Sequence, residues 1–230
     1  KVGKKYSKLK LEQEPINALL SFKHKIADKL IYSKVKQKLG GNIKFFVSGG
    51  APLSKEIGEF FSSVDITILE GYGLTETSPV LTSNTPDKIR FGYVGTSLYN
   101  VDIKIADDGE ILAKGPNIML GYYKNDEATK EVIDNEGWFS TGDIGEIDND
   151  GFLKITDRKK SLLVTSAGKN IAPAPIEGTL SNSSYIEQVL VVGDKKNFIS
   201  ALIVPNFDAL TNHLASLGIT ISEPHALIEH

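Results

Sequence analysis

The chain has 230 residues, of which 40% are hydrophobic and 24% charged, and its formal net charge is −3. This composition is ordinary for a globular protein and leaves room for one domain or two modest ones. The absence of cysteine excludes disulfides and thiolate sites and fits a reducing cytoplasm, where we expect the protein to be. No apolar run approaches the roughly 20 residues that cross a bilayer. Neither an initiator methionine nor a targeting segment opens the sequence, so we expect a piece of a longer chain.

The first 40 residues are basic, with eleven lysines against Glu12, Glu14 and Asp28. From 16 to 39, apolar residues recur every four positions between lysines, which predicts an amphipathic helix. The two recurring sets are Phe22, Ile26 and Leu30, and Ala27, Ile31, Val35 and Leu39. A solvated helix face explains these lysines, although peripheral contact with anionic membrane lipid is also compatible with them. The charge surplus is confined to one helix and lacks interleaved exposed aromatic residues, so a nucleic-acid-binding role is not expected.

A strand–helix–strand pattern follows. Residues 44–47 and 66–69 have the pattern of short buried strands. Between them, Ser54 is a candidate N-cap for a helix that extends to Val64. We expect the buried stripe of this helix to be Ile57, Phe60 and Phe61. The alternation predicts an α/β fold with a mostly parallel sheet and helices packed against it.

A Gly-bearing loop follows each of these strands, at 48–53 and at 70–77. In parallel sheets, ligands bind beyond the carboxyl ends of the strands. One Gly-rich turn is usually only a turn. Two at successive strand ends predict a shared small-molecule site.

The remaining chain changes to short strands and tight turns, which predicts a small antiparallel barrel or sheet followed by a second domain. The expected hairpins pair 101–105 with 110–114, pair 142–147 with 152–156, and bracket 166–170. The other expected elements are helices at 125–133, from Pro175 and at 207–217, and strands at 188–192 and 198–204.

The second Gly-bearing loop carries the densest set of ligand-binding residue types. Its glycines allow a sharp turn or close approach of the backbone to a ligand, and its aromatic ring offers a flat face. Its hydroxyls can hydrogen-bond to a ligand, and its carboxylate is the kind of oxygen ligand that magnesium accepts beside a phosphate. These residues are Gly71, Tyr72, Gly73, Thr75, Glu76 and Thr77.

The order Gly-Tyr-Gly-Leu-Thr-Glu-Thr closely resembles the adenine- and phosphate-binding segment of the adenylate-forming superfamily. That superfamily contains acyl-CoA synthetases, luciferases and the adenylation domains of peptide synthetases. Four further segments match it in order and spacing: 48–53, 138–143, 155–160 and 166–173. Taken singly, each is explained equally well by a turn, a cap or a solvated linker. Five in the right order indicate membership of the superfamily.

The resemblance implies a role for each matching residue. Gly50 and Ala51 would contact the adenine through the backbone, and Gly71, Tyr72 and Gly73 would form the nucleotide loop, with Tyr72 stacked on the adenine. Thr75 would bind the α-phosphate, and Glu76 would hold Mg²⁺. Asp143 would accept hydrogen bonds from both ribose hydroxyls, Ile155 would lie at the nucleotide, and Arg158 would reach ribose or phosphate. Thr75 and Glu76 are the implied catalytic residues. Lys160 would be an interdomain hinge, and Gly168 and Lys169 would belong to a loop presented for a thioester step with CoA.

The implied fold is the C-terminal part of the large domain over 1–157, a hinge at 158–160 and an incomplete small α+β domain over 161–230. The large part would combine a parallel sheet and helices with a small β-barrel. Among superfamily members, bacterial long-chain fatty acyl-CoA synthetases are the most similar at 45–53, 157–160 and 168–173. This implies a fatty acid, ATP and CoA as substrates, and AMP as product.

Two superfamily features are not found in this sequence. One is the loop that ends in Pro-Lys-Gly and cradles the β- and γ-phosphates, and the other is the near-terminal catalytic lysine. We therefore expect the 230 residues alone to complete neither adenylation nor thioester formation. Three alternatives remain open: a ligase for another carboxylate, a ligase that loads a carrier protein, and a non-catalytic module that senses AMP or acyl-adenylate.

Overall fold

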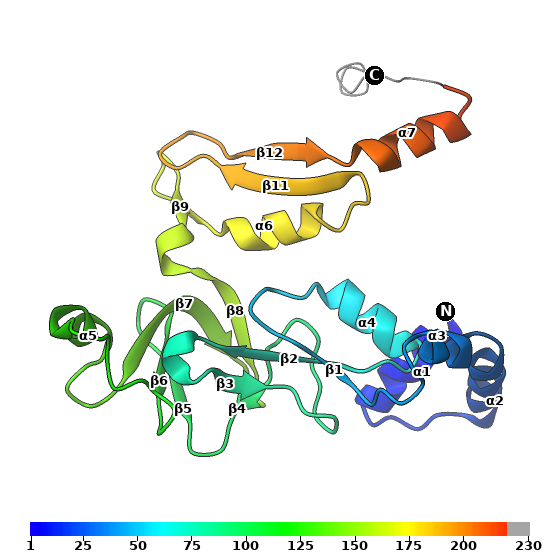
Figure 1. The fold of residues 1–230 in the computed structure, drawn as a ribbon, viewed down its shortest axis with the longest axis horizontal. Coiled ribbons are helices and arrows are strands. Elements are labelled where there is room, and N and C mark those ends of the chain that lie inside the picture. The colour runs from blue at the N-terminus through cyan, green and yellow to red at the C-terminus, as the bar shows by residue number, and fades with distance from the viewer. Residues whose placement is uncertain (220–230) are drawn as a thin grey trace. The chain divides into compact units, whose positions relative to one another are not determined.

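The computed structural model describes residues 1–219 and divides the chain into two compact units, Lys1–Ile155 and Thr156–His230. Residues 220–230, which end the predicted small domain, lie outside the described residues. The described residues form both helices and β-sheets, which confirms the mixed α/β class (Figure 1).

Three α-helices open the first unit, a short strand and a fourth helix follow, and the other strands come next, with a fifth helix among them (Figure 1). The helices are α1 Val2–Leu11, α2 Ala18–Ala27, α3 Ser33–Lys38, α4 Lys55–Ser63 and α5 Asp126–Val132, with a π-helical turn η1 Asp28–Tyr32 between α2 and α3. The strands are β1 Phe46–Ser48, β2 Ile68–Gly73, β3 Val80–Ser83, β4 Thr96–Ser97, β5 Asp102–Ile105, β6 Glu110–Lys114, β7 Phe139–Ile147 and β8 Leu153–Arg158. The division between the two units falls within β8, after Ile155.

The first sheet has the order β1-β2-β3-β4. Strands β1 and β2 pair in parallel, as the sequence predicts, but β3 and β4 extend the sheet antiparallel. Only a 3-10 turn, η2 Thr75–Thr77, and its flanking residues connect β2 to β3, and so short a connection permits only antiparallel pairing. Strand β2 also runs on to Gly73, so the Gly-Tyr-Gly part of the seven-residue motif lies in a strand rather than in the predicted loop.

The second sheet has the order β5-β6-β7-β8, and its first two strands form the predicted hairpin. The segment before β4 links it to the first sheet: Val94 N donates to Leu153 O, and Leu153 N donates to Gly95 O, each at 2.8 Å. A Cβ on Gly95 would overlap the Ser83 carbonyl carbon. Only glycine permits this close approach of β3 to the linking segment.

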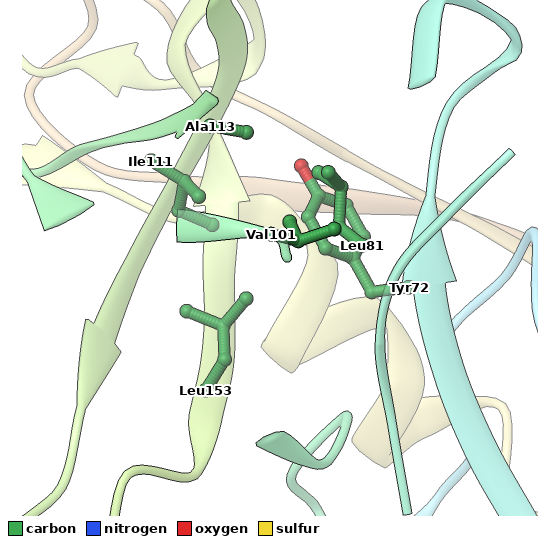
Figure 2. Packing of buried hydrophobic residues seen from close by; sticks show 6 residues of the cluster. All are labelled: Tyr72, Leu81, Val101, Ile111, Ala113 and Leu153. Atoms are coloured by element: carbon green, nitrogen blue, oxygen red, sulfur yellow. The ribbon is translucent and has the colours of Figure 1, made fainter. Parts of the chain in front are cut away.

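The two sheets share one hydrophobic core. Figure 2 shows its six buried members, Tyr72, Leu81, Val101, Ile111, Ala113 and Leu153. They come from β2, β3, β6, β8 and the segment before β5. Burying each large aliphatic side chain stabilises the fold by about 2 kcal/mol. Because Tyr72 of the motif is one of the six, the core fixes β2 against the second sheet.

The basic helical region differs from its prediction in which face is buried. The helix predicted over 16–39 is present, with η1 inside it, but Phe22, Ile26 and Leu30 are exposed. Its buried residues are instead Leu20, His24 and Tyr32, and the His24 ring stacks on Tyr6 of α1 at a centroid distance of 3.8 Å.

Helix α4 begins after Ser54, whose hydroxyl accepts from Ile57 N at 3.3 Å, so the predicted cap is confirmed. The predicted buried stripe is wrong, because Ile57 and Phe60 are exposed. Small residues make the contacts of this helix. Gly58 lies against the Phe91 ring, and the backbone of Gly3 in α1 lies so close to the Ser63 carbonyl oxygen that a Cβ on Gly3 would overlap it. Close backbone approach thus replaces interlocking large side chains.

The second unit contains a short hairpin and a longer strand pair. Its elements are a 3-10 turn η3 Lys159–Ser161, strands β9 Leu163–Val164, β10 Asn170–Ile171, β11 Ile186–Val192 and β12 Ser200–Pro205, and helices α6 Pro173–Leu180 and α7 Phe207–Ser216. The predicted hairpin around 166–170 is confirmed by the antiparallel pairing of β9 and β10. Among residues 1–219, no helix combines the length and the apolarity needed to cross a membrane.

Candidate functional site

The two Gly-bearing segments lie side by side at the ends of β1 and β2. Ser48 pairs with Glu70, so the chain leaves β1 beside the second half of β2. A Cβ on Gly49 would be in contact with Gly71 O, at 3.4 Å. The predicted adenine contacts Gly50 and Ala51 follow directly and are exposed. Exposed backbone that a ligand can reach therefore lies next to the motif at this edge of the sheet.

Tyr72 and Asp143, 71 residues apart in sequence, meet inside the first unit. Tyr72 Oη donates to Asp143 Oδ2 at 2.6 Å, and the two residues are 8% and 5% exposed. The tyrosine ring lies in the hydrophobic core (Figure 2). The structure thus brings together two residues for which the sequence predicts nucleotide contacts, and stacking of Tyr72 on adenine stays a prediction.

An irregularity in β7 sets the position of Asp143. Glu110 pairs with Ile144 and Leu112 with Ser140, so β7 carries extra residues between these pairs. Bulges of this kind redirect a side chain out of the regular alternation. Gly142 N donates to Glu110 Oε1 at 2.9 Å, which ties the bulge to β6. No local sequence signal marked Glu110, because its role depends on the register of two strands.

The other half of the motif forms the tight turn η2. Leu74 N donates to the Thr77 hydroxyl at 2.9 Å, and that hydroxyl lies 2.6 Å from Pro79 O. A Cβ on Gly73 would overlap Pro79 O, so the turn requires glycine there. Thr75 is exposed at the start of this turn, where it is open to a ligand.

Glu76, the predicted magnesium ligand, has a partner that the sequence did not suggest. Tyr122 Oη donates to Glu76 Oε1 at 3.0 Å. Partial burial raises the pKa of Tyr122, and the neighbouring Glu76 carboxylate raises it further. The phenol therefore stays protonated and remains a donor at neutral pH.

The donor set around Glu76 fits magnesium in one particular way. Among residues 1–219, no cluster of three or more His, Cys, Asp or Glu residues is placed to hold a metal ion. Proteins commonly bind Mg²⁺ through one or two carboxylates together with substrate phosphates, without a complete protein cage. The Glu76 carboxylate beside an exposed threonine suits that mode.

Glu70, at the start of the motif, is a further buried carboxyl group, only 6% exposed. Burial raises its pKa to about 7, and a hydrogen bond from Gly92 N at 3.4 Å offsets part of that effect. The only sequence signal at Glu70 is its place at the start of the loop predicted over 70–77.

The remaining predicted residues divide between the units. Ile155 packs against the hydrophobic core of the first unit. Arg158 and Lys160 are exposed residues of the second unit. Gly168 has φ of +75° in the turn between β9 and β10, and Lys169 follows it, also exposed. The first unit therefore contains the residues predicted around adenine and metal, together with Asp143 for the ribose. The second unit contains Arg158, also predicted at the ribose or phosphate, and the residues predicted for hinge and thioester loop.

Comparison with known proteins agrees with this arrangement. The family model described as AMP-binding enzyme matches residues 15–123, and that described as AMP-binding enzyme C-terminal domain matches residues 160–220. The chain belongs to the AMP-binding enzyme family. This confirms the adenylate-forming superfamily indicated by the five sequence segments.

Two curated relatives of this AMP-binding enzyme chain are long-chain-fatty-acid–CoA ligases. FadD15 of Mycobacterium bovis is 47% identical over 219 residues, which cover 92% of this chain and 36% of FadD15. Ligase 5 of Mus musculus is 36% identical over 205 residues, covering 84% of this chain and 30% of that protein. The chain thus spans about a third of the length of these relatives.

A solved structure with a similar fold is the O-succinylbenzoate coenzyme A synthetase MenE from Bacillus subtilis, in complex with ATP and magnesium ion. It aligns with a TM-score of 0.64 at 29% identity, covering 75% of this chain and 40% of MenE.

Proposed function

We propose that this AMP-binding enzyme chain carries the nucleotide-binding part of a long-chain fatty acid–CoA ligase. In such a ligase, a fatty acid carboxylate attacks the α-phosphorus of ATP to give acyl-AMP and pyrophosphate. The thiol of CoA then displaces AMP and forms the acyl thioester. The 47% identity to FadD15 over nearly the whole chain supports this reaction and the substrate class.

The single observation that carries the nucleotide site is the meeting of Tyr72 and Asp143 next to the ends of β1 and β2. A carboxylate has two acceptor oxygens and so suits a pair of ribose hydroxyls. We assign Asp143 to the ribose, the backbone at Gly50 and Ala51 to the adenine, and Thr75 to the α-phosphate. These groups accelerate adenylation by positioning the reactants.

Glu76 is the residue that would hold Mg²⁺, and the complex of MenE with ATP and magnesium ion supports magnesium as the metal. When bound there, Mg²⁺ would supply neutralisation of the phosphate charge. The carboxylate of Glu76 must therefore be directed towards the phosphates. Its turn, η2, provides a rigid base for that direction.

The second unit would take part in the second half-reaction, the formation of the thioester with CoA. We assign 1–157 to the large domain, 158–160 to the hinge with Lys160 as its pivot, and 161–230 to part of the small domain. Gly168 and Lys169 would approach the large domain during thioester formation, after rotation about the hinge. We place the enzyme in the cytoplasm, where ATP and CoA are available.

The experiment that tests this function is carboxylate-dependent exchange of labelled pyrophosphate into ATP by the full-length gene product. A panel of long-chain fatty, aryl and amino acids identifies the substrate, and we expect exchange with long-chain fatty acids. Exchange only with another acid would overturn the substrate class. Acyl transfer to a carrier protein instead of free CoA would indicate a carrier-loading ligase. Binding of AMP without exchange for any acid would indicate a sensing module.

A further inference from the structure

We propose that Tyr122 is a positioning residue that orients the Glu76 carboxylate for metal binding at the nucleotide site. This inference rests on the proposed function, because it assumes that Glu76 holds Mg²⁺. Tyr122 lies outside all five segments that resemble the superfamily motifs, and it acts through Glu76 rather than on the nucleotide itself.

Three contacts join the segment from Asn117 to Tyr122 to the turn η2. Met119 N donates to Glu76 O at 2.8 Å. Asn117 Nδ2 donates to Thr77 O at 2.8 Å and to Val80 O at 3.1 Å. Tyr122 Oη then reaches the side chain of Glu76, at 3.0 Å. The segment therefore fixes both the backbone of the turn and the carboxylate that projects from it.

Helix α5 anchors Tyr122 in turn. Tyr122 N donates to Thr129 Oγ1 at 2.9 Å, and the same hydroxyl donates to Asn125 O at 2.9 Å. Asn125 also caps the helix, because its side chain accepts from Ala128 N at 3.1 Å. The backbone of Tyr122 is thus held by a capped helix, which limits where the phenol can lie.

The chemistry of this contact suits a metal ligand. A glutamate side chain has several rotamers, and fixing one before the ligand arrives removes an entropic cost from binding. The phenol occupies Oε1 and leaves Oε2 for a cation. Because tyrosine is neutral, it orients the carboxylate without cancelling its charge, as lysine would. Hydrogen-bond partners of metal ligands commonly tune affinity in this way.

The neighbouring residue Tyr123 provides a matched control. Tyr123 is 88% exposed and Tyr122 is 37% exposed. Each loses one hydroxyl when changed to phenylalanine, but only Tyr122 has its hydroxyl on Glu76. A difference between the two variants therefore reports the contact with Glu76.

The test compares Tyr122→Phe with Tyr123→Phe in the full-length gene product. Mn²⁺ binding to the AMP-saturated protein is measured by electron paramagnetic resonance, and AMP binding in EDTA by calorimetry. We expect Tyr122→Phe to raise the Mn²⁺ dissociation constant about tenfold and to leave metal-free AMP affinity unchanged. In pyrophosphate exchange, the Mg²⁺ concentration for half-maximal rate should rise, with the rate at saturating Mg²⁺ preserved. Tyr123→Phe should match the wild type.

A second pair of variants tests the anchor. Thr129→Val removes the acceptor for Tyr122 N and should weaken Mn²⁺ binding in the same direction, whereas Thr129→Ser keeps the hydroxyl and should not. Unchanged Mn²⁺ affinity in Tyr122→Phe would overturn the proposal. So would a loss of AMP affinity in EDTA equal to the loss of Mn²⁺ affinity, because that result indicates a purely structural contact. Absence of exchange with every acid would overturn the proposed function instead, and the Mn²⁺ measurement distinguishes the two failures.

Discussion

Two tyrosine–carboxylate pairs lie in the candidate site, and they differ mainly in their surroundings. Tyr72 and Asp143 are both buried and 2.6 Å apart, and the ring of Tyr72 belongs to the core. Tyr122 and Glu76 are 3.0 Å apart, and Tyr122 remains 37% exposed. Low dielectric strengthens a buried hydrogen bond and also raises the cost of breaking it. Water competes with the exposed pair. A tyrosine–carboxylate hydrogen bond therefore stabilises the fold at Tyr72 and Asp143, whereas at Tyr122 it orients Glu76, the proposed metal ligand.

The largest expected effect is on the buried pair. Tyr72→Ala removes an aromatic ring from the core and should lower the free energy of unfolding by roughly 3–5 kcal/mol. Tyr72→Phe keeps the ring but loses the hydrogen bond to a carboxyl group, which should cost about 1.5–3 kcal/mol. Urea unfolding of the full-length gene product measures both changes. A Tyr72→Phe variant as stable as the wild type would show that the buried hydroxyl contributes nothing to the fold.

Glu70 sharpens the comparison, because it is a buried carboxyl group whose hydrogen bond comes from a backbone N–H, that of Gly92, at 3.4 Å. Its folded-state pKa, about 7, lies above the ordinary value of 4.5. Between these values the folded state binds a proton that the unfolded state has released. The contribution of Glu70 to the free energy of unfolding should therefore be fully present below pH 4.5. It should fall as the pH rises to about 7 and level off above that pH.

The corresponding variant is Glu70→Gln, which cannot ionise. Thermal unfolding across pH 4.5 to 8 should show a flatter profile for the variant than for the wild type. Above pH 7 the variant should gain up to about 3 kcal/mol relative to the wild type. Parallel profiles for the two proteins would contradict a raised pKa at Glu70.

The smallest effect on stability is expected for the exposed pair. Tyr122→Phe should change the free energy of unfolding by less than about 0.5 kcal/mol, as is usual for substitutions at the surface. The same urea unfolding series measures it beside Tyr72→Phe. A loss as large as that of Tyr72→Phe would remove the contrast between the two pairs.

Local signals in the sequence predicted the elements well. Ser54 marked the start of α4, and Asp107-Asp108-Gly109 marked the β5–β6 hairpin, because caps and tight turns depend on a few adjacent residues. Burial was predicted less well. Phe22 and Phe60 have the spacing of a buried stripe and are exposed, because small residues and ring stacking determine the helix contacts.

The partners of the site residues could not be predicted from adjacent sequence. Asp143 was identified by resemblance, but its contact with Tyr72 depends on the register shift between β6 and β7. The contact of Tyr122 with Glu76 joins residues 46 apart and depends on where α5 packs. Spacing within a segment carries no information about either contact.

The most direct measurement is AMP binding by calorimetry to the full-length gene product and to its Asp143→Ala variant. Asp102→Ala serves as the control, because it removes the same charge from an exposed position of the same sheet. If Asp143 binds the ribose, its replacement should weaken AMP binding by roughly 1.5–3 kcal/mol, and the control should bind as the wild type does. Unchanged affinity in a folded Asp143→Ala variant would contradict a nucleotide site where β2 meets β7.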